Sequence, residues 1–104
     1  MAYKVVLTKL AEEQLTSCFY HIFYEYINES AAKSFLDDAE STLNRLSNIA
    51  DGLPICEDDY LKKFEYRIIH FKKYRYKMIY RISGDKVFVD GVYYNLQDLK
   101  RHIG

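Results

Sequence analysis

The sequence predicts a small α+β protein with the element order βααβββα, in which an N-terminal helical hairpin packs on a mostly antiparallel, twisted sheet and a short helix follows. Two observations lead to this prediction. Apolar residues in the first half recur every three or four positions, as on one face of a helix, whereas in the second half they alternate. The length of 104 residues and the apolar fraction of 49% fit one globular domain spanning residues 1–104.

The first half predicts a strand and two helices. The β-branched run YKVVLT at 3–8 is typical of a strand. Thr8 can cap a helix over 9–27, and Ser30 can cap a second one whose apolar period reaches Leu46. Asp-Gly-Leu-Pro at 51–54 ends that helix, and the short turn between the two helices favours an antiparallel hairpin.

The second half predicts an acidic loop at 55–63, three strands and a final helix at 96–103. The strands are 64–71, 74–82 and 86–94, with a hairpin turn at 83–85. Because two helices separate the first strand from the others, it can lie parallel to a later strand, at the sheet edge or beside the last strand.

Alternation within the middle strand separates two patterns. One face should carry the apolar side chains Tyr74, Tyr76, Met78, Tyr80 and Ile82. We expect a positive outer face made by Arg75, Lys77, Arg81 and, from the preceding strand, Arg67.

The net charge of zero conceals a strong asymmetry along the chain. Residues 1–60 carry four bases and eleven acids, whereas residues 61–104 carry eleven bases and four acids. A charge split of this kind favours a polyanionic partner for one surface, and the alternative is a solvated sheet face paired with acidic helices of the same molecule. The candidate nucleic-acid contacts are Lys62, Lys63, Lys72, Lys73 and Arg75.

Several classes of function are disfavoured by the composition. No apolar run approaches the roughly 20 residues of a membrane span, and acids interrupt the N-terminal segment, so we expect a cytoplasmic protein without membrane contact. Cys18 and Cys56 lack ligand spacing, which disfavours a metal site. No Gly-rich phosphate loop and no Ser or Cys nucleophile arrangement is visible, so no cofactor is expected.

The order of the motifs resembles the RelE/ParE toxin superfamily of bacterial type II toxin–antitoxin systems. YKVVLTKLAEEQL is similar to that family's opening strand and helix, and SAAKSFLDDAESTLNRL to its second helix. The segment from YRIIHF to YYNLQD is similar to its C-terminal sheet, in which a tyrosine precedes a basic residue and a second tyrosine closes the strand, here Tyr76, Lys77 and Tyr80.

The resemblance implies a small toxin that a cognate antitoxin protein neutralises. RelE-like members cleave messenger RNA on the ribosome without a metal, whereas ParE-like members inhibit DNA gyrase, and one fold carries both activities. We expect ribosome-dependent mRNA cleavage, with gyrase inhibition, or a degenerate member that only binds its antitoxin, as alternatives.

Metal-free RNA cleavage requires a base, an acid and cations around one phosphate. The candidate cations are Arg67, Lys77 and Arg81. The resemblance assigns phosphate contact to Arg67, and proton transfer or base stacking to Tyr94. Lys77 stands where many active members carry arginine, and lysine lacks the bidentate fork that suits a phosphate.

Other residues count against cleavage or are given structural roles. Leu96 and Gln97 replace the family's basic pair, and Gln97-Asp98 resembles the ParE-like ending. His70 has the opposite strand parity from Arg67, and we interpret it as a packed or surface histidine. His21 and His102 are interpreted as structural or solvated.

Overall fold

The computed structural model describes residues 2–94, except for the Tyr26 side chain. The element bounds are β1 Lys4–Leu7, α1 Lys9–Tyr26, α2 Glu29–Ile49, the 3-10 helix η1 Ala50–Gly52, α3 Asp59–Lys63, β2 Arg67–His70, β3 Lys77–Ser83 and β4 Lys86–Tyr93. The predicted α+β class and the long helical hairpin are confirmed, whereas the predicted helix at 96–103 lies outside the described residues.

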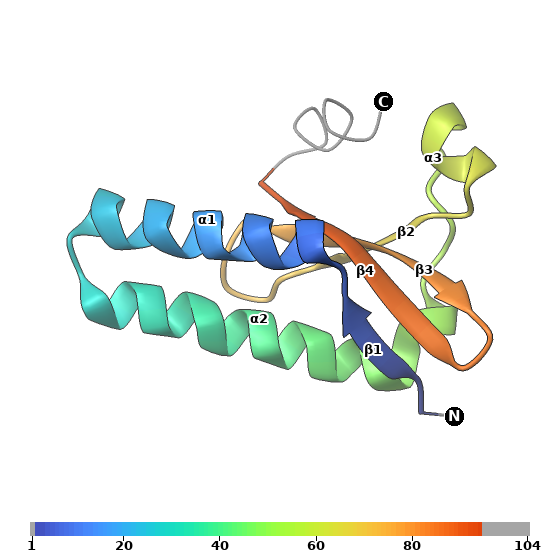
Figure 1. Cartoon of the computed structure of the whole chain (residues 1–104), viewed down its shortest axis with the longest axis horizontal. Coiled ribbons are helices and arrows are strands. Elements are labelled where there is room, and N and C mark those ends of the chain that lie inside the picture. Colours follow the sequence, from blue (N-terminus) through green and yellow to red (C-terminus); the bar gives the residue numbers. More distant parts are fainter. Residues whose placement is uncertain (1, 95–104) are drawn as a thin grey trace.

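The four strands form one sheet in the order β1-β4-β3-β2. β1 pairs with β4 in parallel, and β2–β3 and β3–β4 are antiparallel, so the prediction of a parallel first strand at the edge and beside the last strand is confirmed. Figure 1 shows α1 and α2 running side by side, with the turn between them at the end remote from β1. We call the side of the sheet that packs on these helices the helix face, and the opposite side the outer face.

The helix face holds the main core because strand alternation places the large apolar side chains there. Met78 and Tyr80 of β3 and Val87 and Val89 of β4 pack with Phe35 of α2. The hydroxyl of Tyr80 also donates to the Ala50 carbonyl at 2.7 Å, which satisfies a buried polar group at the end of α2.

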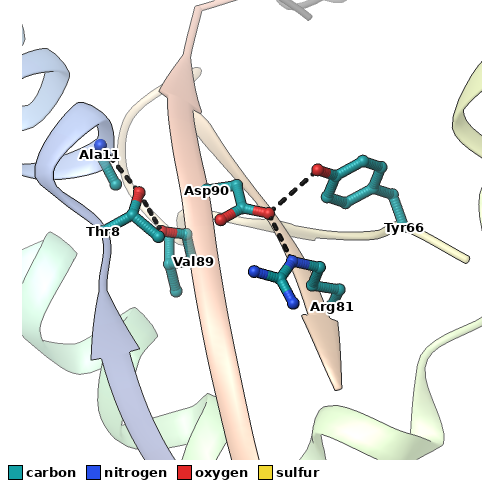
Figure 2. Close-up of polar contacts among 6 residues, drawn as sticks. All are labelled: Thr8, Ala11, Tyr66, Arg81, Val89 and Asp90. Atoms are coloured by element: carbon teal, nitrogen blue, oxygen red, sulfur yellow. Dashed lines mark hydrogen bonds and ion pairs between the residues drawn. The ribbon is translucent and has the colours of Figure 1, made fainter. Parts of the chain in front are cut away.

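Side-chain caps fix where both long helices begin. Thr8 accepts from the Ala11 amide and donates to the Val89 carbonyl, so the predicted cap also fastens the start of α1 to β4 (Figure 2). Asn28, not Ser30, caps α2, because its side-chain oxygen accepts from the Ser30 amide at 2.8 Å. An asparagine oxygen fulfils the same function two residues earlier than the expected serine.

The segment expected to be an acidic loop contains the short helix α3. Asp58 caps it by accepting from the amides of Tyr60 and Leu61. Leu61 is buried against Ile79 and Tyr93 in a second, smaller core on the outer face. The outer face is therefore less basic than the sequence predicts, since its middle is apolar and packs against α3.

The register also corrects the predicted positive face. Arg67 is paired with Tyr80, and partners in a ladder point to the same side, so Arg67 lies on the helix face. Lys77 and Arg81 have the opposite parity and lie on the outer face. Arg75 belongs to the loop before β3. The sequence predicted correctly which side chains of β3 share a face. Which face of β2 matches which face of β3 depends on the pairing register, and this is defined only in the folded sheet.

No helix in the described part of the chain has both the length and the apolar character that a membrane span requires.

Candidate functional site

The loop between β2 and β3 carries three of the six exposed basic side chains that the structure describes between residues 61 and 94. The Phe71 amide donates to the Tyr76 carbonyl at 2.9 Å and closes the hairpin. The side chains of Lys72, Lys73 and Arg75 are exposed between these two aromatic residues. We call residues 72–75 the basic loop.

One face of α2 holds the basic loop in place through aromatic packing. Phe35 contacts the rings of Phe71, Tyr74 and Tyr76, with centroids 5.2 to 5.7 Å apart. The Tyr74 hydroxyl also donates to the Ala31 carbonyl at 3.1 Å. The tyrosines of this segment are thus part of the packing, while the basic side chains between them face solvent.

A buried carboxylate on the same face of α2 completes this attachment. Asp38 is only 4% exposed, and its two oxygens accept the backbone amides of Lys72, Lys73 and Tyr74 at 3.1, 2.8 and 3.1 Å. Three amide donors replace the water that a carboxylate would otherwise lose on burial. Asp38 lies three residues after Phe35 on the buried stripe of α2, on which Thr42 is the other polar residue. A charge on such a stripe is a signal in the sequence that could have predicted this role.

A groove of about 970 Å³ runs between α1, the basic loop and the end of β4. Its lining comprises Gln14, Ser17, Cys18, His21 and Glu25 of α1, residues 73–76, and residues 92–94. The α1 residues share one helical side, and the amide of Val92 donates to the Gln14 side chain at 3.0 Å, which fixes the edge of β4 against α1. Three distant parts of the chain therefore meet here.

The groove contains aromatic, titratable and cationic groups. Tyr94 is 51% exposed, and its ring meets that of Tyr76 edge-to-face at 5.5 Å. His21 Nε2 lies 2.8 Å from the Glu25 carboxylate at the surface. Burial raises the pKa of the Cys18 thiol to about 11, so Cys18 is protonated at neutral pH and is not an activated nucleophile.

His21 and Glu25 were not predicted as site residues. Their spacing of four positions places both on one side of α1, but only the tertiary structure brings that side next to the basic loop.

Arg67 is bound to the end of the helical layer. Its guanidinium donates to the carbonyls of Asp51 and Leu53, which follow α2. A cation at this position also interacts favourably with the negative, C-terminal end of the α2 dipole. Both hydrogen bonds come from Nη1, and they fix the guanidinium beside the end of α2.

Arg81 is held on the outer face by a carboxylate. Figure 2 shows Asp90 between two donors, Arg81 Nε at 2.9 Å and the Tyr66 hydroxyl at 3.0 Å. The Arg81 guanidinium also lies over the Phe88 ring at 4.8 Å. Burial, followed by the charge of Asp90, raises the pKa of Tyr66 to about 12, so the phenol remains a neutral donor.

Lys77 lies at the loop end of the outer face, between His70 and Tyr93 in the register. His70, interpreted from the sequence as packed or on the surface, is exposed on the same face as Lys77. The remaining predicted contacts, Lys62 and Lys63, are exposed on α3.

The structure brings together only some of the predicted site residues. Tyr94 shares the groove with Lys73 and Arg75. By contrast, the four predicted catalytic residues are divided between the two faces of the sheet. Arg67 pairs across the ladder with a helix-face residue, and Tyr94 packs on Tyr76 of the main core. Within residues 2–94, no three His, Cys, Asp or Glu side chains gather in a way that could hold a metal ion.

Comparison with known proteins gives a match at the level of the fold. No protein-family model matches the sequence, and no curated protein matches it. Among solved structures, the chain is similar to one described as the chromosomal ParDE TA system from P. aeruginosa. The TM-score is 0.71 at 15% sequence identity, and the match covers 88% of this chain and 94% of the other. The two chains therefore share a fold.

Proposed function

We propose that this chain is the toxin of a type II toxin–antitoxin system and that it inhibits its target by binding, in the manner of ParE-like inhibitors of DNA gyrase. The motif order resembles that superfamily, and a solved chain from a system named ParDE has the same fold. The proposed partner in the cell is a cognate antitoxin, acidic where it covers the basic loop.

The separation of the four predicted catalytic residues is the observation that favours binding over RNA cleavage. In-line attack on a phosphodiester needs the base, the acid and the stabilising cations within a few ångströms of one phosphate. Arg67 donates to backbone carbonyls and Arg81 is paired with Asp90. These contacts hold the two guanidinium groups on opposite faces of the sheet, so the two arginines do not converge on one phosphate.

A supercoiling assay with purified protein and DNA gyrase tests this proposal. Inhibition that increases with protein concentration, and that an equimolar antitoxin relieves, is the expected result. A chain with full toxicity in cells but no effect on gyrase would refute the gyrase-directed mechanism. A chain without toxicity that still binds its antitoxin tightly would identify a degenerate member.

Ribosome-dependent mRNA cleavage is the second candidate, and the groove favours it. Tyr94 and His21 are groups capable of proton transfer, and Lys73 and Arg75 supply positive charge along the same lining. Mapping 5′ ends of translated transcripts after expression is the test. New ends within codons, lost on Tyr94→Phe or His21→Gln, would support this candidate, and intact transcripts in a growth-arrested culture would exclude it.

A further inference from the structure

We propose that Asp38 is a positioning residue for phosphate binding: its buried carboxylate orders the basic loop so that Lys72, Lys73 and Arg75 meet the backbone of a nucleic acid in a preformed arrangement. This inference rests on the proposed function, because either candidate target would bring a nucleic acid to the toxin: gyrase acts on DNA, and the ribosome carries mRNA.

The hydrogen-bond geometry is the first step of the argument. Three consecutive amides, from Lys72 to Tyr74, point at one carboxylate, with two of them on Oδ2 and one on Oδ1. A backbone whose successive amides converge on one anion has a fixed local conformation. An asparagine at position 38 could not reproduce this arrangement, because its NH₂ group would face at least one of the donors.

The distribution of charge is the second step. Asp38 is 4% exposed and accepts three backbone amides, and within residues 2–94 none of Lys72, Lys73 and Arg75 forms an ion pair. The loop therefore presents three positive side chains whose backbone is held by an acid that does not cover them. Ordering a flexible loop before binding reduces the entropy lost when the ligand arrives.

The surroundings favour a nucleic acid over an acidic peptide. Tyr94 is 51% exposed and lines the groove together with Lys73 and Arg75. An exposed aromatic ring near cations is the combination that single strands use for stacking and phosphate contact. The ring of Tyr76 packs edge-to-face against the ring of Tyr94. An acidic peptide would use the cations but not this aromatic group.

The test measures binding of a fluorescein-labelled single-stranded oligonucleotide by anisotropy at several salt concentrations. Replacing Lys72, Lys73 and Arg75 by glutamine should weaken binding. It should also reduce the magnitude of the slope of log K against log salt by about 2, because each of the three lost phosphate contacts accounts for roughly 0.7. Asp38→Asn should weaken binding roughly tenfold although it removes a negative charge and leaves every cation in place. Asp37→Asn makes the same change of charge at the exposed neighbouring position and should not weaken binding.

A double-mutant cycle separates positioning from general destabilisation. In the background with the three glutamines, Asp38→Asn should change affinity less than twofold, whereas its effect on the unfolding midpoint should be the same in both backgrounds. Amide exchange at residues 72–74 should accelerate in Asp38→Asn, with the exchange of β3 and β4 amides unaffected at equal folded fraction.

Three outcomes would overturn the proposal. The first is an equal loss of affinity in both backgrounds, and the second is an Asp38→Asn protein that binds as the wild type does. The third is a wild-type chain that binds polyglutamate but not the oligonucleotide, which would identify an acidic protein as the ligand. Each of these can occur in a chain that is fully toxic, so failure here is distinct from failure of the proposed function.

Discussion

Replacing Arg67 by methionine tests whether its guanidinium serves the fold or the target. Methionine keeps most of the apolar stem but removes the donors to the carbonyls of Asp51 and Leu53. Hydrogen bonds from a charged group contribute about 1.5–3 kcal/mol each when buried, and these are partly exposed. We therefore expect a total loss of about 2 kcal/mol in the free energy of unfolding.

Thermal unfolding followed by circular dichroism provides the assay. For a domain of this size, about 1 kcal/mol corresponds to roughly 4–8 °C, so Arg67→Met should lower the midpoint by about 8–16 °C. Arg75→Met is the matched control, because Arg75 is an exposed loop residue whose truncation should change stability by less than about 0.5 kcal/mol. The unfolding midpoint of Arg67→Lys should lie between those of wild type and Arg67→Met, because a single ammonium group can replace only part of the guanidinium's hydrogen bonds to the two carbonyls.

The reasoning would be refuted if Arg67→Met unfolded at the same temperature as the Arg75→Met control while losing activity per folded molecule. That result would mean that the guanidinium leaves its carbonyl partners and acts on the target, as the family resemblance implies.

Three further predictions concern packing and ionisation. Gly91→Ala should destabilise the protein by about 2 kcal/mol in urea unfolding, because the new Cβ would lie 2.2 Å from the buried Tyr93 ring. Gly52→Ala is the control and should be close to neutral, because its new Cβ meets open space. Equal effects of the two substitutions would contradict this prediction. Burial raises the pKa of Tyr80 to about 12 from 10.0, so the unfolded chain loses this proton first and stability should fall as pH rises from about 10 toward 12. The fall of the urea midpoint should be shallower in Tyr80→Phe, and an unchanged slope would exclude this group as a cause. With a pKa of about 11, Cys18 should be alkylated by iodoacetamide at pH 8 roughly 100-fold more slowly than the same cysteine in urea, and fast alkylation of the native protein would indicate an open, ionised thiol.

Local patterns in the sequence were sufficient for most of the secondary structure. Helical periodicity, the Thr8 cap and strand alternation predicted the helical hairpin and three antiparallel strands within a few residues. The short helix α3 was missed because its few apolar positions show no periodicity. Leu61 is buried only because α3 packs on Ile79 and Tyr93, and this contact cannot be read from the segment itself.

The chemistry of the site depended on relations that no single segment encodes. The sequence by itself determined that positive charge and tyrosine concentrate in residues 62–81, and that tyrosines alternate with bases. Pairing register then decided that Arg67 lies on the opposite side of the sheet from Lys77 and Arg81. Tertiary packing decided that Asp38 holds the basic loop. The physical reason is that alternation and periodicity are properties of one backbone segment, whereas register, hydrogen-bond partners and burial arise only when segments distant in sequence compete for the same surface.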